Sequence, residues 1–243
     1  MLHLITALKE ITASAINLVF PPSCVHCGSP GALLCHICVS ESSSVQKNVC
    51  RKCAEPLAKA GTCARCVSER SSIDRLYASY LYESPVGSAI KALKFDDVRA
   101  LGGVLARMFD VDAMSRSDAD LVVPVPLHKS RLRSRGYNQS ELLGLLLSNR
   151  IEIKFQADVL VRTRQTVPQS ELPTAAARHR ALAGGFSVKP SSMKSVSGKR
   201  ILLVDDVFTT GSTVKACADA LKTAGASWVG VAALAVQPIG GLK

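Results

Sequence analysis

Residues 200–213 read Arg-Ile-Leu-Leu-Val-Asp-Asp-Val-Phe-Thr-Thr-Gly-Ser-Thr, and this stretch decides the expected fold. Its run of four aliphatic residues, bounded by charge, is typical of a strand buried on both faces inside a parallel sheet. Asp205 and Asp206 then stand at the carboxyl end of the strand, where ligands bind in open α/β sheets. The hydroxyl-rich residues 209–213 open a helix predicted over 212–224, and free N–H groups at a helix start bind phosphate. The stretch therefore predicts a site for a phosphorylated sugar.

Three other structures also contain a hydrophobic strand that ends in acids. A Walker B strand would need a partner sequence G-x-x-x-x-G-K-[ST], which the chain lacks. A receiver domain would need more chain than the 38 residues that follow Asp205. A plain buried strand with a solvated turn would use Ser212 as an ordinary helix cap. Two adjacent acids followed by T-T-G-S-T exceed what a cap requires, and this favours the ligand site.

Eight of the nine cysteines form four C-x-x-C pairs. Each pair can supply two thiolates to one ion, so the four pairs predict two structural Zn²⁺ sites of four cysteines each. Disulfides are the alternative, but no secretory signal is recognised, and a redox C-x-x-C would stand alone beside a βαβ unit. The linker 40–44 favours pairing in sequence order, with interleaving left open, and Cys217 is predicted to be a small buried residue. The predicted ligands are Cys24, Cys27, Cys35, Cys38, Cys50, Cys53, Cys63 and Cys66.

The composition favours an anionic partner. A net charge of +11 over 243 residues fits nucleic acid or a polyphosphate ligand, whereas 5% aromatic residues leave few stacking platforms for a dedicated single-strand binder. Residues 1–20 have apolar side chains at helical spacing and predict a short docking helix, because a membrane-surface helix would need a basic face. No transmembrane segment or secretory signal is predicted, and a cytoplasmic location is expected.

A second buried strand is predicted over 120–126, and a basic segment follows it. Placed after a parallel strand, these charges would face the sheet edge that carries Asp205 and Asp206 and would balance a pyrophosphate there. A solvated basic turn and a nucleic-acid patch are the alternatives. Lys91 and Lys94 lie on one face of an earlier predicted helix, for which exposure to solvent is the commoner explanation. The predicted pyrophosphate-side cations are Lys129, Arg131, Arg133 and Arg135.

A second basic segment begins as a strand near residue 159. It continues as a polar loop and a short helix predicted over 174–182. A mobile basic loop between two core strands can shield a leaving pyrophosphate from water. The predicted loop residues are Arg162, Arg164, Gln169, Arg178 and Arg180. The remaining pattern predicts strands over 75–82 and 228–236 and helices over 85–93, 98–114 and 138–148.

The stretch 201–213 resembles the phosphoribosyl pyrophosphate (PRPP) motif of type I phosphoribosyltransferases. The resemblance implies that Asp205 and Asp206 are the catalytic acids and hold the ribose hydroxyls. It implies Mg²⁺ as the metal bound with PRPP, and displacement of pyrophosphate at ribose C1. It places the 5′-phosphate on Thr209, Thr210, Gly211, Ser212 and Thr213.

The motifs P-V-P-L-H, R-x-R-x-R-G-Y-N-Q, R-T-R-x-T-x-P-Q-x-x-L and V-D-D-V-x-T-T-G-S-T follow a double C-x-x-C ribbon. This combination is similar to the ComF family (ComFC/GntX-like). It implies an α/β type I phosphoribosyltransferase fold, with a parallel sheet flanked by helices and an N-terminal Cys₄ zinc-ribbon module. The implied division is a docking helix over 1–20, a double zinc ribbon over 21–70 and a phosphoribosyltransferase-like domain over 71–243. Ala181 and Gly185 depart from the Asn and Ala usual in the family near G-A-F.

The same domain resembles that of glutamine amidophosphoribosyltransferase, but the chain has no room for a glutaminase domain and carries Leu2 instead of its cysteine nucleophile. Two functions then remain. The chain transfers a phosphoribosyl group from PRPP to an acceptor that the sequence does not name, or it is a non-catalytic module that binds single-stranded DNA. The family resemblance implies a role in DNA uptake during natural competence, with other competence proteins as partners. The basic ribbon residues are Lys47, Arg51, Lys52, Lys59, Arg65 and Arg70.

Overall fold

A four-stranded parallel sheet forms the centre of the computed structural model, which describes residues 21–162 and 185–237. The strand order is β1-β6-β5-β2, so β5 and β6 are the inner strands. Each inner strand is flanked by a neighbour on both edges and by helices on both faces, which explains its almost continuous aliphatic sequence. The strands are β1 (Arg75–Leu81), β2 (Leu121–Pro124), β5 (Arg200–Phe208) and β6 (Trp228–Val236).

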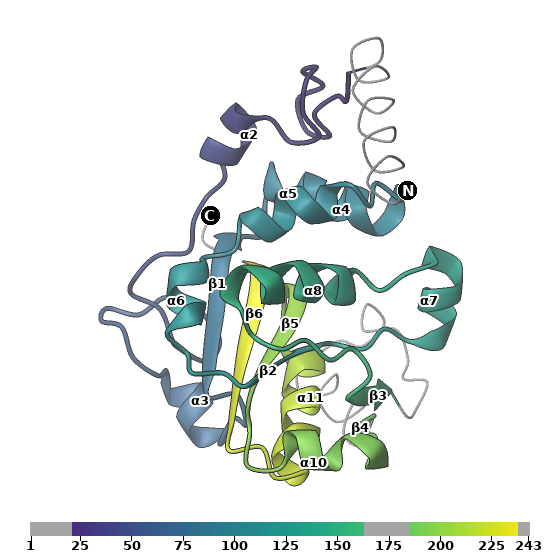
Figure 1. The fold of residues 1–243 in the computed structure, drawn as a ribbon. Coiled ribbons are helices and arrows are strands. Elements are labelled where there is room, and N and C mark those ends of the chain that lie inside the picture. Colours follow the sequence, from purple (N-terminus) through teal and green to yellow (C-terminus); the bar gives the residue numbers. More distant parts are fainter. Residues whose placement is uncertain (1–20, 163–184, 238–243) are drawn as a thin grey trace.

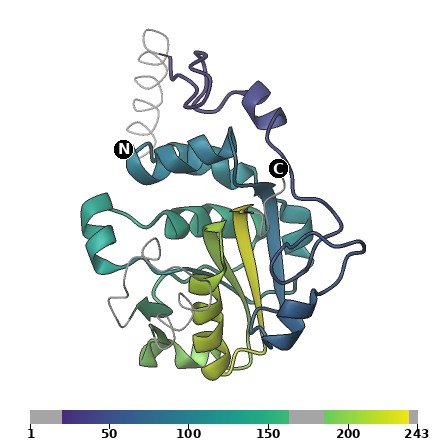
Figure 2. The same ribbon diagram turned by 180° about the vertical axis from the view of Figure 1, so that it is seen from behind.

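Helices cover both faces of this sheet. Helix α8 (Gln139–Ile151) packs on one face and α11 (Ser212–Thr223) on the other, as the two opposite views show (Figures 1 and 2). Alternate residues of β5 point to the two sides: Leu202 joins the apolar cluster under α8, and Leu203 joins the cluster under α11. The predicted α/β class, a parallel sheet flanked by helices, is confirmed.

The predicted helix over 98–114 is two helices, α5 (Leu101–Arg107) and the short α6 (Val111–Ser115). Helix α5 and the preceding helix α4 (Val86–Phe95) lie across the carboxyl end of the sheet (Figure 1). The break occurs at Asp110, whose carboxylate accepts a hydrogen bond from the Ala113 N–H at 3.3 Å and begins α6.

The basic segment after β2 forms the helix α7 (Lys129–Arg135), which the sequence did not predict. The His128 ring nitrogen Nδ1 accepts a hydrogen bond from the Ser130 N–H at 3.2 Å, and Gly136 ends the helix with a φ of 77°. No residue of α7 is buried, so local capping defines the helix and no apolar pattern announces it.

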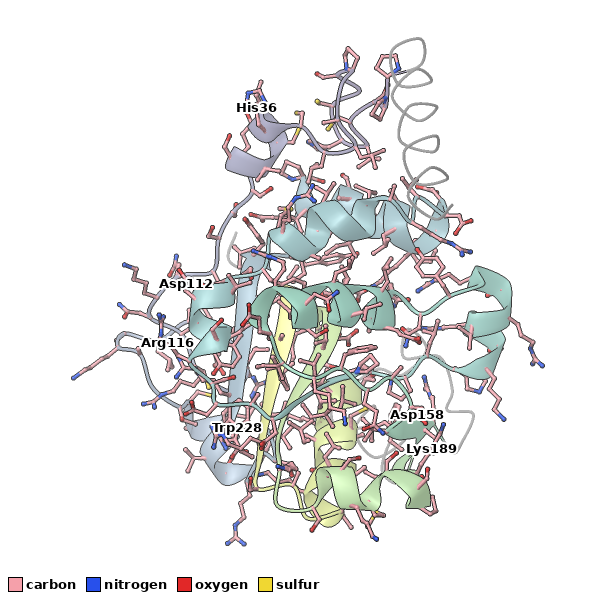
Figure 3. The ribbon with its side chains drawn as sticks, viewed as in Figure 1. His36, Asp112, Arg116, Asp158, Lys189 and Trp228 are labelled. Carbon is pink, nitrogen blue, oxygen red and sulfur yellow. The ribbon has the colours of Figure 1, made fainter. Side chains whose placement is uncertain are left out.

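Strands β3 (Leu160–Arg162) and β4 (Phe186–Val188) pair antiparallel in a small sheet of their own. The expectation that the basic loop joins two strands of the core is therefore corrected. An ion pair of 3.7 Å between Asp158 and Lys189 lies next to this small sheet (Figure 3). The 3₁₀ turn η2 (Pro190–Ser192) and α10 (Met193–Val196) lead from β4 to β5. The predicted loop residues Arg164, Gln169, Arg178 and Arg180, the helix over 174–182, Ala181 and the docking helix over 1–20 lie outside the described residues.

The two cysteine ribbons sit at opposite ends of the sheet. The first, with α2 (His36–Ser40), packs on α4 through Leu34 and through a 3.1 Å hydrogen bond between the His26 ring and the Ser88 hydroxyl. The second, with α3 (Ala64–Ser68), packs in the cluster under α11, and its Glu69 pairs with Lys215. Only the first ribbon therefore lies at the end of the sheet that carries Asp205 and Asp206 (Figure 1).

The segment between the ribbons runs along the outer edge of the sheet. Ser43 accepts a hydrogen bond from the Leu81 N–H at 2.8 Å, and the Val45 N–H donates to the Ser79 carbonyl at 3.1 Å. These bonds cover the free edge of β1, which would otherwise expose unpaired backbone groups. Across residues 21–162 and 185–237, every helix is too short or too polar to span a bilayer.

Candidate functional site

The two predicted acids lie at the carboxyl end of β5 and have different surroundings. Asp205 is half-buried, and one carboxylate oxygen, Oδ1, accepts hydrogen bonds from the Ser140 hydroxyl and the Asp206 N–H, both at 2.9 Å. The Asp206 side chain is only 4% exposed, and its Oδ1 lies 2.9 Å from the Lys94 ammonium. Its second oxygen, Oδ2, has no hydrogen-bond partner among the described residues. A buried oxygen without a partner is costly, which indicates a place for a ligand hydroxyl or a metal.

The surroundings of Asp205 raise its pKa into the neutral range. Burial, followed by the negative charge of Asp206, raises the pKa of Asp205 to about 7, and the charge of Lys94 opposes this rise. Shifts of this kind arise where carboxyl groups share a desolvated site, and they are frequent in ligand-binding clefts.

Gly211 shapes the turn between β5 and α11. Its φ of 72° belongs to the left-handed region, and a Cβ at this position would lie 2.4 Å from the Cζ atom of the buried Phe208 ring. Only glycine satisfies both conditions. Gly211 itself offers no side chain to cap α11, and the positive end of the helix dipole follows directly on the end of β5, a position that favours an anion.

Two of the predicted phosphate-binding hydroxyls contact each other. The Thr210 and Ser212 hydroxyl oxygens are 2.8 Å apart, and the Ser212 N–H donates to Thr210 Oγ1 at 3.4 Å. The Ser212 residue is 3% exposed, so this pair braces the turn from inside. The phosphate roles of residues 209–213 remain predictions.

Two of the four predicted pyrophosphate-side cations share one face of α7. Arg131 and Arg135 are one helical turn apart, and both line a hollow of about 560 Å³. Lys129 and Arg133 are not among its lining residues. Each is two residues from Arg131, and this spacing puts them on the opposite side of the helix. The hollow is lined by Lys94, Phe95, Asp97, Arg131, Ser134, Arg135 and Gln139.

Electrostatic effects connect these cations to the acids. Burial lowers the pKa of Arg135, and the negative charge of Asp206 opposes the change. Burial also lowers the pKa of Arg162, with the charge of Arg131 as the next cause. The charge of Arg135 thus interacts with those of Asp206 and Arg131. Arg131 in turn interacts with Arg162, a residue of the predicted loop.

Lys94 is the site residue for which the sequence favoured the wrong explanation. It lies near the end of α4 with 18% of its side chain exposed, pairs with Asp206 and lines the hollow, whereas Lys91 on the same helix is exposed. The spacing of the two lysines could place them on a helix surface, but only the tertiary fold brings Lys94 to the acids.

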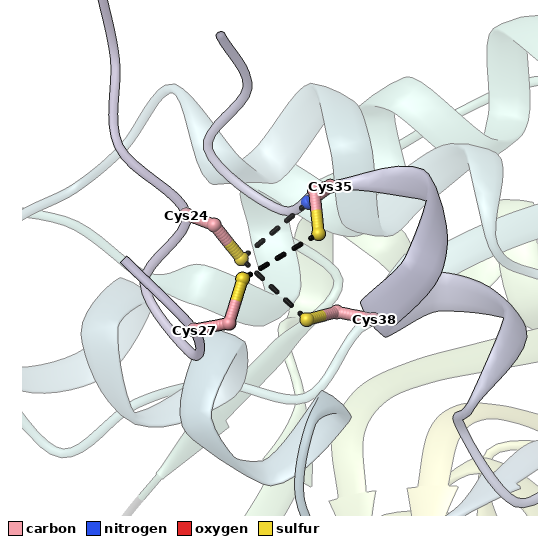
Figure 4. A group of neighbouring side chains, drawn as sticks. All are labelled: Cys24, Cys27, Cys35 and Cys38. Atoms are coloured by element: carbon pink, nitrogen blue, oxygen red, sulfur yellow. Dashed lines mark hydrogen bonds between the residues drawn. The ribbon is translucent and has the colours of Figure 1, made fainter. Parts of the chain in front are cut away.

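The eight paired cysteines form two clusters in sequence order, which confirms the favoured pairing. They are Cys24, Cys27, Cys35 and Cys38, whose sulfur atoms point to a common centre (Figure 4), and Cys50, Cys53, Cys63 and Cys66. The sulfur–sulfur distances are 3.7 Å for Cys24–Cys38, 3.6 Å for Cys27–Cys35 and 3.7 Å for Cys53–Cys63. A Zn–S bond of about 2.3 Å gives a tetrahedral edge of about 3.8 Å, whereas a disulfide is about 2.05 Å long. The donors fit two structural zinc ions.

Backbone N–H groups prepare these thiols to bind metal. The Cys35 N–H donates to Cys24 Sγ at 3.5 Å, and the Cys63 N–H donates to Cys50 Sγ at 3.3 Å. Burial raises the pKa of both acceptor thiols, but their N–H donors outweigh it and lower the pKa to about 6 for Cys24 and about 7 for Cys50. Cys217, outside both clusters, is fully buried as predicted.

Both the ribbon region and the C-terminal half of the chain match known protein families. A family model described as "Double zinc ribbon domain" matches residues 15–67, and one described as "Phosphoribosyl transferase domain" matches residues 139–243. The DNA utilization protein YhgH of Escherichia coli (strain K12) is 32% identical over 225 residues, which are 88% of this chain and 96% of that protein. The chain belongs to the ComF family.

Other ComF relatives carry competence names. Competence protein F of Haemophilus influenzae is 30% identical over 87% of this chain and 96% of that protein, and competence protein ComFC of Streptococcus pneumoniae is 27% identical over 79% and 83%. Among solved structures, glutamine PRPP amidotransferase from B. subtilis is 24% identical over 56% of this chain and a quarter of its own, with a TM-score of 0.35. A purine phosphoribosyltransferase from Pyrococcus horikoshii is 17% identical over 56% and 72%, with a TM-score of 0.36.

Proposed function

We propose that the chain binds PRPP together with Mg²⁺ and transfers its phosphoribosyl group to an acceptor. One observation supports this most strongly: the buried carboxylate of Asp206 keeps an oxygen that has no hydrogen-bond partner among the described residues, at the end of the strand that leads into α11. Diol, phosphate and pyrophosphate groups occur together in PRPP, and the acids, the turn and the cations have the chemistry to bind these three groups respectively. We further propose the division into residues 1–20, 21–70 and 71–243, and a cytoplasmic location.

In this proposal each group performs a distinct part of the reaction. Asp205 and Asp206 orient the ribose and stabilise the positive charge that develops at C1 as the bond to pyrophosphate breaks. Arg131 and Arg135 balance the leaving group, and residues 209–213 hold the 5′-phosphate. Bound Mg²⁺ would neutralise part of the pyrophosphate charge.

Calorimetric titration of the wild-type protein with PRPP in the presence of Mg²⁺ tests the proposal. We expect a dissociation constant on the order of micromolar to millimolar, the range of common enzyme substrates. Asp206→Asn should weaken binding by about 100-fold, because the neutral amide loses the charge-assisted bonds to the diol. Asp112→Asn on α6, an exposed acid at a distance from β5 (Figure 3), serves as control. Absence of heat with the wild type would refute PRPP binding.

A second hollow favours a second function, binding of single-stranded DNA. It measures about 490 Å³, lies between the second ribbon and β1, and is lined by three exposed cations, Lys47, Arg51 and Arg75. Two of the six predicted ribbon cations serve the fold instead, since Lys52 donates to the Ser71 carbonyl and Arg65 pairs with Glu55. The relatives named for competence and DNA utilization agree with this candidate and with competence proteins as partners.

Binding of a fluorescent single-stranded oligonucleotide, measured against salt concentration, tests this second function. Each phosphate contact contributes about 0.7 to the slope of log affinity against log salt, so a triple change of Lys47, Arg51 and Arg75 to alanine should lower the slope by about 2. A flat salt response in the wild type would remove DNA binding by phosphate contacts.

A further inference from the structure

Lys94 and Asp206 form a buried ion pair inside the proposed ligand site. The ammonium lies 2.9 Å from Oδ1, and the two side chains are 18% and 4% exposed. Removing two charges from water is costly, and their attraction repays the cost only when other bonds satisfy both groups. Here Oδ2 of Asp206 has no partner among the described residues, so the pair is incomplete as a purely structural contact.

The position of Lys94 also connects the acids to the anion-binding side. Lys94 lines the 560 Å³ hollow together with Arg131 and Arg135. The one acid among the lining residues, Asp97, is paired with Arg99 at 2.8 Å. The hollow therefore has an excess of positive charge. The charge of Lys94 is neutralised by Asp206 while no ligand is bound.

We propose that Lys94 is an exchangeable counter-ion: it neutralises Asp206 in the free protein and turns to the pyrophosphate when ligand hydroxyls occupy the carboxylate. This inference rests on the proposed function and assigns a ligand-binding residue to it. In the free protein the lysine, 2.9 Å from Asp206, reduces the repulsion between this carboxylate and its neighbour Asp205. In the bound protein the diol takes over hydrogen bonding at Asp206, and the released ammonium adds a third cation to Arg131 and Arg135 at the hollow.

A structural tie between α4 and β5 is the competing explanation. It predicts that loss of the pair loosens the site for every ligand equally. An exchangeable counter-ion instead predicts a difference between ligands, because only a ligand with a pyrophosphate gains from the lysine. Ribose 5-phosphate carries a hydroxyl at C1 where PRPP carries the pyrophosphate and otherwise has the same groups, so the relative affinities of the two ligands separate the two explanations.

The test titrates wild type, Lys94→Met, Lys94→Arg and Lys91→Met with PRPP and with ribose 5-phosphate, both in the presence of Mg²⁺. Lys94→Met should weaken PRPP binding by about 10- to 100-fold, the size of a charge-assisted contact, and should leave ribose 5-phosphate within about threefold of wild type. Lys94→Arg keeps the charge and should retain most of the PRPP affinity. Lys91→Met removes the same charge from an exposed position of α4 and should bind as wild type does.

The outcomes differ for the inference and for its basis. An equal loss for both ligands in Lys94→Met, or no loss for either, overturns the exchangeable counter-ion while PRPP binding itself stands. A wild type that binds neither ligand removes the proposed function and the inference with it. Thermal melting of each variant shows whether it is folded, and Lys94→Arg tests the charge without leaving Asp206 unpaired.

Discussion

Asp205→Asn is expected to stabilise the protein at pH 8 and to weaken PRPP binding strongly at the same time. In the folded protein the pKa of Asp205 is raised to about 7, whereas an unfolded aspartate titrates near its ordinary value of 3.8. Between about pH 4 and pH 7, the folded state therefore holds a proton on Asp205 that the unfolded state has lost. The stability contributed by this group is present below about pH 4 and is lost as the pH rises through 7.

Asparagine removes this pH dependence, because it is neutral at every pH and its oxygen can still accept from the Ser140 hydroxyl. At pH 8 the variant should gain about 1–3 kcal/mol in free energy of unfolding relative to wild type, and near pH 4 the difference should approach zero. Urea unfolding at both pH values measures the two differences. PRPP binding should fall by about 100-fold, because the amide lacks the charge of the carboxylate. The variant would then be more stable than wild type and bind its ligand less well, as is common when a strained site residue is replaced.

Asp120→Asn provides a control of opposite sign. The Arg200 N–H donates to Asp120 at 2.8 Å, Lys199 lies 3.2 Å away, and these contacts lower the pKa of this exposed carboxyl. Its contribution to stability is present above the ordinary aspartate pKa and is lost on acidification, so the variant should lose stability at pH 8 and not at pH 3. If Asp205→Asn behaved in the same way, the Asp205 carboxylate would be ionised and stabilising, against the argument above.

Local sequence signals predicted the two elements that follow the acids in the chain. The strand over 228–236 matches β6, and the helix over 212–224 matches α11 within one residue, because an aliphatic run and a glycine-containing turn define their ends without tertiary help. The cysteine pairing was predictable for the same reason, since each C-x-x-C brings its two thiols together before the chain folds.

What the sequence missed depends on contacts between distant segments. Lys94 reaches Asp206 only because α4 lies across the sheet edge, and no periodicity in the sequence encodes that distance of 112 residues. Helix α7 buries nothing, so it lacks the apolar pattern by which helices are recognised. The separation of the two ribbons follows from the hydrogen bonds of segment 43–45 along β1. The serine-rich sequence of this linker gives no signal of that pairing.

The two zinc ions are expected to leave at very different rates under a chelator. Every cysteine of the second cluster is at most 6% exposed and belongs to the apolar cluster that also contains Ile73 and Leu76. In the first cluster Cys27 is exposed and Cys35 is partly exposed, so a chelator can reach that ion without unfolding the domain. Chelator and zinc-sensitive dye should therefore record two phases of one ion each, the fast one from the first ribbon.

Loss of the second ion should unfold much of the domain. Structural zinc contributes about 10–16 kcal/mol to folding in zinc-finger peptides, more than the whole stability of an ordinary domain. The slow phase should coincide with loss of near-ultraviolet circular dichroism, and the fast phase should leave that signal largely intact.

Single substitutions assign the phases. Cys27→Ser should remove the fast phase alone, and Cys53→Ser should yield a protein that is poorly folded even with zinc in excess. Cys217→Ser, a buried cysteine on α11 outside both clusters, should keep two ions and both phases. Release of both ions in one step from the wild type would show that the ribbons unfold together, and the burial of the second cluster would then not govern its metal. If two phases appear and Cys27→Ser abolishes the slow one, the exposed cluster holds the tighter ion, and the accessibility of the sulfur atoms is not what limits release.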